Sequence, residues 1–447
     1  MAETTKKLLG SVTISPQIID EVGAQVKDIG DFKKKIEEYL VKSVTELLDV
    51  VLYGAIVLNA SDIHLEPQEE EARLRIRLDG ILQDVIFFER SAYRHLLSRL
   101  KLLSKLKLNI TDKPQDGRFT IEIKEILIEI RTSSLPAEYG ESVVMRILNP
   151  KSLISLDELG LRADLYKIFQ KEITKPNGMI IVTGPTGAGK TTTLYAFLKK
   201  IQNPEIKIIT IEDPIEYHIV GISQTQVAPE KGYDFSNGLR SIVRQDPDVI
   251  LVGEIRDLET AETALQAALT GHLVLSTLHT NDAAGTIPRL IDLGVNPATI
   301  AAGLKMAVAQ RLVRKVCKKC STLVEPSLDQ LNELKEGLKN LPKEIKIPNL
   351  EKVKIAKAKE GGCSACNFTG YKGRKGLFEA FLVDSEMERF ILTNPPVSRI
   401  KELAIKKGLV TMYQSGLIDI VEGTTTFEEV YRVVEADEKT NEAPSQI

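Results

Sequence analysis

Residues 178–194 read GMIIVTGPTGAGKTTTL, and their centre, GPTGAGKT from Gly184 to Thr191, fits the pattern G-x-x-x-x-G-K-[ST] at every position. The apolar residues 179–182 predict a buried strand, and the TTTLYAFLKKI that follows the lysine predicts a helix. A glycine-rich loop between a strand and a helix holds phosphate groups with its backbone N–H groups. A glycine-rich turn without a ligand is disfavoured, because the lysine and the threonine also stand where phosphate binding requires them.

Each part of this loop has an expected role. The glycines allow the backbone to turn around phosphate oxygens, Lys190 reaches the β- and γ-phosphates, and the Thr191 hydroxyl ligates Mg²⁺. ATP and Mg²⁺ are therefore the expected cofactors. The residues expected to hold the nucleotide here are Gly184, Pro185, Thr186, Gly187, Ala188, Gly189, Lys190, Thr191 and Thr192.

The composition is that of an ordinary globular protein. The chain has 447 residues, 43% of them hydrophobic, and a formal net charge of −3. This charge and the aromatic content of 5% disfavour a nucleic-acid-binding protein, which needs a basic groove or stacking rings. The longest apolar run, residues 50–58, is too short to span a bilayer, and the first residues lack the apolar segment of a signal peptide. We therefore expect a cytoplasmic protein with at most a peripheral membrane association.

Composition and periodicity divide the chain into segments. Strict alternation in ARLRIRL, within a hairpin over 72–88, indicates a sheet with arginines on one face. Alternating helices and β-rich runs further on indicate a parallel α/β sheet, with strands near 178–183, 206–211, 248–252 and 272–278. The expected order is a partly helical lead-in over 1–40, an α+β sheet domain over 41–148, a linker over 149–161, the parallel α/β core over 162–309, a cysteine-containing element over 310–380, a small helical subdomain over 381–435 and a disordered tail over 436–447.

Carboxylates follow two of the expected core strands. Glu212, Asp213 and Glu216 stand just past the strand near 206–211, and Glu254 stands just past the next one. Ligands bind at the carboxyl ends of the strands in such sheets. We expect Glu254 and Glu212 to divide the activation of water and the orientation of Mg²⁺. The sequence leaves open which of the two is the general base.

Two histidines flank the last of these strands. His279 follows the strand in LVLSTLHTND, where a histidine could contact the γ-phosphate. His272 precedes the strand, and for it a role in packing is as good an interpretation as contact with the nucleotide.

Four cysteines form two C-x-x-C pairs. Cys317 and Cys320 make the first pair, Cys363 and Cys366 make the second, and 42 residues separate the pairs. Two such pairs are typical of a closed, structural zinc site with four thiolate ligands. Four unliganded buried thiols are the weaker alternative, so Zn²⁺ is an expected cofactor.

Taken together, these motifs resemble the ATPases of type II secretion and type IV pilus assembly. The phosphate loop, IEDPIEY, VGEIRD, TGHLVLSTLHTND, SDIHLEP, QDGR, AQRLVRK and the cysteine pairs carry the resemblance, which covers about residues 42–435. It implies a RecA-like P-loop ATPase core joined flexibly to a smaller N-terminal α+β (PAS-like) sheet domain. It also implies a homohexamer that works on an inner-membrane platform protein, which inserts pilin-like subunits. Retraction ATPases of the same superfamily usually lack the cysteine element, so its presence favours assembly or secretion.

The resemblance also implies roles for arginines outside the phosphate loop. Arg118 and Arg131, which the sequence places near strand ends of the sheet domain, match arginines that approach the nucleotide when the two domains close. Arg240 and Arg244 in LRSIVRQDP resemble core-domain arginines that do related work from a neighbouring position. A guanidinium group suits this task because it offers two-point neutralisation of phosphate charge.

Three other functions remain as alternatives. A nucleotide-gated zinc module that binds nucleic acid is opposed by the charge and the few aromatic residues. A scaffold that binds ATP without hydrolysing it is opposed by the presence of Lys190, Glu254 and Glu212. A pilus retraction ATPase is opposed by the cysteine pairs. The sequence leaves open whether the system makes pili or exports protein. It also leaves open how a chain with so short an N-terminal lead-in docks to a membrane-associated partner.

Overall fold

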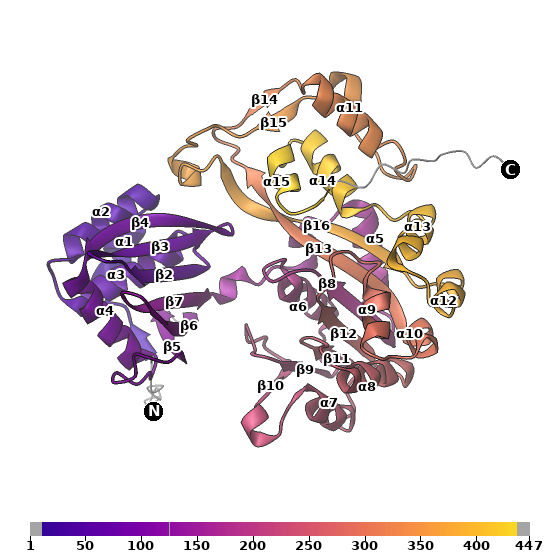
Figure 1. The fold of residues 1–447 in the computed structure, drawn as a ribbon, viewed down its shortest axis with the longest axis horizontal. Coiled ribbons are helices and arrows are strands. Elements are labelled where there is room, and N and C mark those ends of the chain that lie inside the picture. The colour runs from indigo at the N-terminus through magenta and orange to yellow at the C-terminus, as the bar shows by residue number, and fades with distance from the viewer. Residues whose placement is uncertain (1–10, 125, 436–447) are drawn as a thin grey trace. The chain divides into compact units, whose positions relative to one another are not determined.

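The computed structural model describes residues 11–124 and 126–435, and it separates into two compact units (Figure 1). The first unit contains the described residues up to Ser152 together with Glu360–Lys372. The second contains Leu153–Lys359 and the described residues from Gly373 onward. The tail expected over 436–447 lies outside the described residues.

The first unit is a seven-stranded sheet with helices packed on one face (Figure 1). The strand order is β1-β5-β6-β7-β2-β3-β4, and the pairs are antiparallel except that β1 runs parallel to β5. The helices are α1 (Pro16–Gln25), α2 (Ile29–Tyr39), α3 (Val44–Val57) and α4 (Arg90–Leu103), and the strands are β1 (Ser11–Thr13), β2 (Asp62–Pro67), β3 (Glu71–Leu78), β4 (Ile81–Glu89), β5 (Gln115–Ile123), β6 (Ile126–Ala137) and β7 (Gly140–Leu148).

The described part of the expected lead-in belongs to this unit's core. Ile18, Phe32 and Ile36 of α1 and α2 are buried in the same cluster as Leu74 and Ile76 of β3. The alternation in β3 places these leucine and isoleucine side chains on the helix-covered face. The β3 arginines lie on the other face, where ion pairs with carboxylates of β2 hold them instead of solvent alone.

The second unit is built on another seven-stranded sheet, of order β10-β9-β11-β12-β8-β13-β16. The strands from β10 to β13 pair in parallel. The strands are β8 (Gly178–Thr183), β9 (Ile208–Glu212), β10 (Ser223–Gln226), β11 (Val249–Val252), β12 (Leu273–Leu278), β13 (Leu304–Val316) and β16 (Tyr371–Leu382). The predicted α/β fold class is therefore confirmed, and four of these strands, β8, β9, β11 and β12, are the predicted ones.

Helices cover both faces of this sheet because alternate residues of its central strand face opposite ways. Ile180 and Val182 of β8 pack with α5 (Ala163–Glu172) and α6 (Lys190–Ile201). Met179 and Ile181 pack on the other face. That face is covered by α7 (Phe235–Val243), α8 (Leu258–Leu269), α9 (Thr286–Asp292) and α10 (Pro297–Gly303).

The core sheet continues beyond residue 309, where the sequence placed the start of the cysteine element. β13 begins at Leu304 and β16 adds the last strand, so both strands belong to the core. Residues 306–309 of β13 are fully buried. A short, continuous apolar run of this kind shows no hydrophobic periodicity, so its sequence does not distinguish a strand from a helix. The remaining elements are α11 (Leu328–Gly337), β14 (Thr322–Val324), β15 (Ile355–Lys357), α12 (Ser385–Ile391), α13 (Val397–Lys406), α14 (Met412–Val421), α15 (Phe427–Tyr431) and the short 3-10 turns η1 (Pro150–Ser152), η2 (Leu156–Leu159), η3 (Pro229–Lys231), η4 (Leu350–Lys352) and η5 (Ser364–Cys366).

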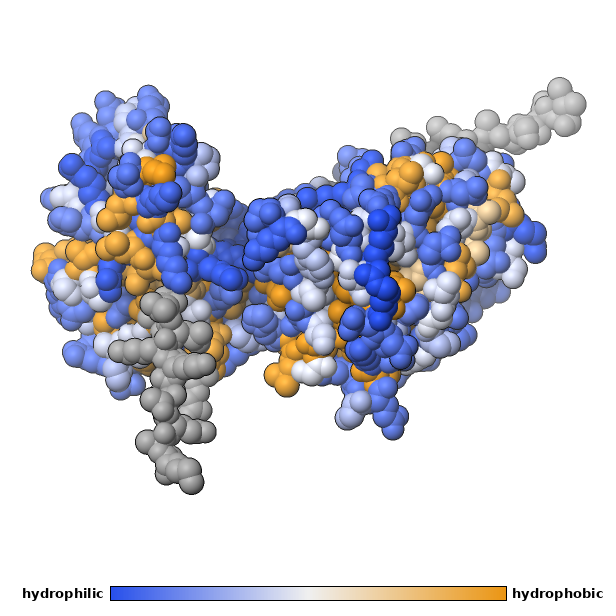
Figure 2. All heavy atoms as spheres, turned by 90° about the horizontal axis from the view of Figure 1, so that it is seen from below, coloured by the Kyte–Doolittle hydropathy of each residue, from blue (hydrophilic) through white to orange (hydrophobic). Residues whose placement is uncertain are grey.

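On the face shown in Figure 2, hydrophilic residues cover most of the surface and hydrophobic residues gather in separate small patches. Within residues 11–124 and 126–435, no helix combines the length and the apolar character that crossing a bilayer requires.

Candidate nucleotide site

The phosphate loop joins β8 to α6 in the second unit. Gly184, Gly187 and Gly189 have φ values of 150°, 81° and 88°, a region that favours glycine. β13 passes close behind the loop, because a Cβ atom on Gly184 would lie 2.6 Å from the carbonyl oxygen of Gln310. The Gln310 side chain accepts a hydrogen bond of 2.8 Å from Thr193 Oγ1, which fixes the first turn of α6. The glycines are therefore required by backbone conformation and by close packing.

Lys190 points back over this loop. Its Nζ donates to the carbonyl oxygen of Gly184 at 2.7 Å and to that of Pro185 at 3.2 Å. Burial lowers the pKa of Lys190, and the negative charges of Glu254 and Glu216 partly offset this effect. The ammonium group therefore lies where phosphates are held, between a phosphate-binding loop and two carboxylates.

Glu254 and His279 meet at the same edge of the sheet. Glu254 follows β11, its side chain is 16% exposed, and its carboxylate pairs with Arg256. His279 follows the neighbouring strand β12, and its Nε2 lies 3.6 Å from Oε2 of Glu254. Burial and the charge of Lys190 lower the pKa of His279, in that order, so the imidazole is favoured in its neutral form.

A hydrogen-bonded threonine holds the His279 loop against the phosphate-loop strand. Thr183, the last residue of β8, donates from Oγ1 to the carbonyl oxygen of Leu278 at 3.1 Å. The same Oγ1 accepts from the backbone N–H of Thr280 at 2.8 Å. The structure thus brings Lys190, Glu254 and His279 together, as the sequence predicted from the strand ends.

Glu212 does not fit the catalytic role that the sequence assigned to it. It ends β9 and is 3% exposed, and both of its carboxylate oxygens already accept hydrogen bonds. Thr210 Oγ1 and Gln224 Nε2 donate to Oε1 at 2.6 and 3.2 Å, and the Tyr195 hydroxyl donates to Oε2. Burial raises the pKa of Glu212. A carboxylate enclosed in this way holds β9, β10 and α6 together, and three hydrogen bonds occupy most of its accepting positions.

Glu216 is a carboxylate that the sequence analysis placed just past a core strand but to which it assigned no role. It lies four residues after Glu212 in the same IEDPIEY stretch, is half-buried and stands close enough to Lys190 to raise the pKa of that lysine. The signal was present, because Glu216 also follows a core strand. The sequence did not show the direction in which each side chain points, because this depends on the path of the backbone after β9 ends.

The structure does not bring His272, Arg240 of α7 or Arg244, which follows α7, to this group. His272 stands before β12, at the opposite end of the strand from His279, and its Nδ1 lies 2.9 Å from the carbonyl oxygen of Ala267. Its packing interpretation is therefore the one that the second unit supports. Arg240 pairs with Glu259 of α8, and Arg244 donates to Ser241 Oγ at 3.2 Å.

Arg118 and Arg131 lie in the first unit as direct cross-strand neighbours. Arg118 on β5 stands opposite Arg131 on β6, in the middle of both strands and not at the strand ends expected from the sequence. Arg118 is exposed, and Arg131 pairs with Glu129 at 3.1 Å. Register across a sheet depends on long-range pairing, which the alternation within one strand cannot supply.

The four cysteines gather into one cluster. One sulfur from each of Cys317, Cys320, Cys363 and Cys366 lies within 4.8 Å of the others. The sulfur atoms of Cys363 and Cys366 are 3.8 Å apart. Thiolates placed about 2.3 Å from a zinc ion at tetrahedral angles are about 3.8 Å apart, so this donor set fits zinc. Backbone N–H groups of Cys363 and Gly370 also donate to Cys366 Sγ, as suits a thiolate.

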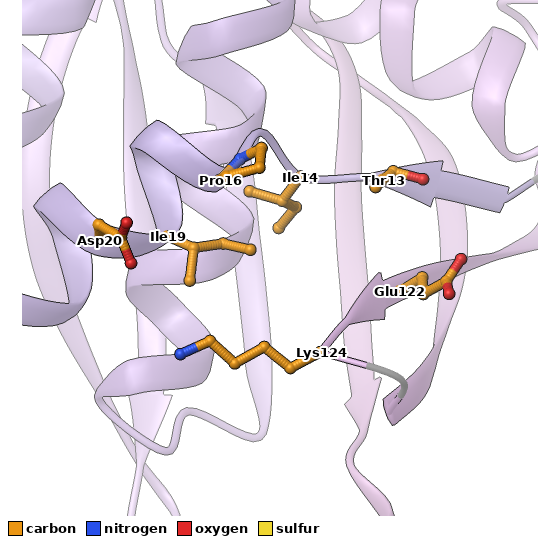
Figure 3. Close-up of a pocket in the computed structure, with 7 residues that line it drawn as sticks. All are labelled: Thr13, Ile14, Pro16, Ile19, Asp20, Glu122 and Lys124. Atoms are coloured by element: carbon orange, nitrogen blue, oxygen red, sulfur yellow. The ribbon is translucent and has the colours of Figure 1, made fainter.

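A cavity in the first unit holds none of the residues that the sequence singled out. It has a volume of about 340 Å³ and lies between β1, α1 and the end of β5 (Figure 3). Ile14, Pro16 and Ile19 line it beside the charged side chains of Glu122 and Lys124.

Comparison with known proteins gives consistent relatives. Residues 38–432 match the family model described as type II/IV secretion system protein. The chain is 42% identical over 417 residues to the type IV pilus assembly ATPase PilB of Thermus thermophilus, covering 91% of this chain and 46% of that protein. It is 40% identical over 425 residues to the type II secretion system ATPase E of Vibrio cholerae, covering 93% of this chain and 82% of that protein. The chain therefore spans about half the length of the first relative and most of the second.

Solved structures share the fold. The pilus retraction motor PilT with bound ADP matches with a TM-score of 0.57 and 26% identity, covering 86% of this chain and 96% of that one. The ATPase DotB of Legionella pneumophila matches with a TM-score of 0.61 and 21% identity, covering 86% of this chain and 94% of that one.

Proposed function

Because the chain belongs to the type II/IV secretion system protein family, we propose that it is an ATP-hydrolysing motor that drives assembly of a type IV pilus or a type II secretion pseudopilus. The observation that carries this proposal is the meeting of Lys190, Glu254 and His279 around the phosphate loop. The family supports it, since the relatives that cover most of this chain are named as pilus assembly and secretion ATPases.

In this proposal the site works mainly by position and charge. The loop N–H groups and Lys190 would hold the phosphates, and the Thr191 hydroxyl would hold Mg²⁺, which would supply neutralisation of phosphate charge when bound. Glu254 accepts the proton of the attacking water. It is suited to this role because it directly follows β11, which fixes its position beside the phosphate loop. The negative charge of Glu216 supports the ammonium group of Lys190. His279 donates a hydrogen bond to the γ-phosphate from a neutral ring, in agreement with the lowered pKa.

The wider setting is part of the proposal. The chain acts as a cytoplasmic homohexamer, peripheral at the inner membrane, and binds an inner-membrane platform protein rather than nucleic acid. The N-terminal sheet domain, the core, the cysteine element and the helical C-terminal part move relative to one another during turnover. Retraction is the less favoured direction of work, because the identity to assembly and secretion ATPases is about 40% and that to PilT is 26%.

Replacing Lys190 with alanine tests the proposal. Loss of a charge that contacts the transferring phosphates is expected to lower ATP turnover by on the order of 10²-fold. Phosphate release by the purified full chain is the measurement. Lys200→Ala is the matched control, since Lys200 is exposed on the same helix and should leave turnover unchanged. Equal turnover of Lys190→Ala and wild type would reject the phosphate-loop mechanism.

We propose zinc as the metal held by the cysteine cluster. Protein purified without chelator is expected to contain about one equivalent of zinc per chain, as a four-thiolate site requires. Cys317→Ser should lower the melting temperature and the zinc content while changing the ATP affinity of the folded fraction much less. Ser321→Ala, which changes the residue directly after the first cysteine pair, is the control and should keep the zinc content and the melting temperature of wild type. Metal-free wild type with an unchanged melting temperature contradicts this assignment.

A further inference from the structure

A buried carboxylate of β16 has no role in the mechanism above. Glu379 is 3% exposed, and both of its carboxylate oxygens accept hydrogen bonds from backbone N–H groups. Its Oε1 accepts from Ala283 at 2.8 Å, and its Oε2 accepts from Met412 at 2.9 Å. Burying a carboxylate costs free energy unless hydrogen bonds compensate it. One side chain therefore joins two backbone segments that are far apart in the chain.

The first of these segments is the loop that carries His279. The loop follows β12, and side chains from β8, β13 and β16 hold its backbone at three places. Thr183 bonds to the N–H of residue 280, Arg311 Nη2 donates to the carbonyl oxygen of residue 281 at 2.7 Å, and Glu379 bonds to the N–H of residue 283. A loop fixed at three points keeps one path, so the imidazole at its start keeps one orientation.

The second segment is the start of α14. Met412 is the first residue of this helix, and Thr411 caps it by accepting a hydrogen bond of 3.1 Å from the N–H of Gln414. The first N–H groups of a helix carry a partial positive charge, which favours a carboxylate beside them. Burial raises the pKa of Glu379, and the N–H groups of Ala283 and Met412 act against this effect. The start of α14 thus favours the charged form of Glu379, which accepts both bonds.

We propose that Glu379 is a positioning residue of the nucleotide site, which holds the His279 loop in place and joins it to the start of α14. Glu379 acts through His279 and not on the nucleotide itself. A shift of the start of α14 would move this carboxylate and the loop bonded to it. The inference rests on the function proposed above, because it gives Glu379 a part in ATP turnover.

Glu379→Gln in the full chain tests the proposal. An amide nitrogen accepts no hydrogen bond, so one of the two backbone N–H groups loses its partner. The kcat of the folded protein should fall by about tenfold or more, because a misplaced reacting group slows the chemical step. The Kd for ATP should stay at the wild-type value, because the phosphate loop is unchanged. In a His279→Ala background, the same substitution should lower kcat by less than about twofold, because the residue through which it acts is gone.

Asp419→Asn is the matched control. It also removes a buried carboxylate charge, but Asp419 lies on α14 and pairs with Lys375 instead of the His279 loop. This variant should lower the melting temperature and keep the kcat of the folded fraction. The proposal is overturned by wild-type kcat in folded Glu379→Gln, by an equal loss in Asp419→Asn, or by the same fold-loss with and without His279.

Amide hydrogen exchange gives a second measurement, which needs no ATP hydrolysis. Exchange over residues 281–285 should be faster in Glu379→Gln than in wild type, and unchanged in Asp419→Asn. A wild-type chain that does not hydrolyse ATP rejects the function proposed above, and the role of Glu379 in turnover falls with it. Normal hydrolysis together with unchanged exchange in Glu379→Gln rejects the role of Glu379 alone.

Met412→Pro tests the α14 end without altering Glu379, and it also serves if Glu379→Gln does not fold. Proline is favoured at the first residue of a helix, and the extended ψ of 161° at Thr411 suits a residue before proline. Met412→Ala is its control, because alanine also removes the methionine side chain but keeps the N–H that Glu379 accepts. Met412→Pro should have the lower kcat and the faster exchange over residues 281–285. Equal kcat and equal exchange in these two variants overturn the link to α14.

Discussion

Glu254→Gln is expected to lower ATP turnover by about 10²- to 10⁴-fold while ATP binding stays close to wild type. The amide keeps the size of the side chain and its place beside His279, but it accepts no proton from the attacking water. Binding survives because the loop N–H groups and Lys190 hold the phosphates. Phosphate release and equilibrium binding of a fluorescent ATP analogue, measured on the same preparation, separate the two effects.

Glutamine variants of the two neighbouring carboxylates sharpen this assignment. Glu216→Gln should lower turnover, because Glu216 acts on Lys190 from the same edge of the sheet. Glu212→Gln should instead lower the free energy of unfolding by about 1–3 kcal/mol, because its amide nitrogen cannot accept the buried hydrogen bond of Tyr195 or of Thr210. The folded fraction of Glu212→Gln should hydrolyse ATP at a rate closer to that of wild type than Glu254→Gln or Glu216→Gln does. Normal hydrolysis by Glu254→Gln, or a greater catalytic loss in Glu212→Gln than in Glu216→Gln, contradicts the assignment.

Arg131→Ala and Arg118→Ala are each expected to lower kcat by on the order of 10³-fold, the usual contribution of an arginine that stabilises charge on a transferring phosphoryl group. The proposal is that the sheet domain presents both side chains to the γ-phosphate when ATP draws the domains together. The register of β5 against β6 places Arg118 and Arg131 directly opposite each other, so the sheet carries two cationic side chains at neighbouring positions, and Glu129 pairs with Arg131. Two neighbouring cationic side chains are a physical reason for a phosphate to dock there.

Steady-state ATPase assays of the full chain decide whether these arginines act on the nucleotide. Arg94→Ala is the matched control, because Arg94 is exposed on α4 of the same unit and the substitution removes the same charge. The melting temperature of Arg118→Ala should equal that of wild type because Arg118 is exposed, whereas Arg131→Ala also loses the ion pair with Glu129, so turnover is compared per folded protein. Wild-type turnover in both variants rejects the proposed closure.

The local sequence pattern was sufficient to predict functional residues wherever these residues are close together in the chain. The phosphate loop was identified from its own residues, because the glycines, the lysine and the threonine act within one turn of backbone. Glu254 and His279 were found for a related reason: both follow strongly apolar runs, and parallel strands end at the same edge of a sheet. The spacing of the cysteine pairs predicted the cluster of four sulfur atoms, and the family was recognised from the same motifs.

What the tertiary structure decided was the direction of side chains and the pairing of distant segments. Glu212 and Glu216 stand four residues apart in one motif, yet packing against Tyr195 and Gln224 encloses the first and leaves the second near Lys190. β13 and β16 pair into the core sheet through hydrogen bonds with strands far away in the chain. In the separate sheet of the first unit, the register of β5 against β6 places Arg118 opposite Arg131. Periodicity shows which residues share a face within one element. The element that packs on that face, and the register of a strand, are fixed only when separate elements pack together. The free energy that selects them comes from burial and pairing between elements, which no single segment contains.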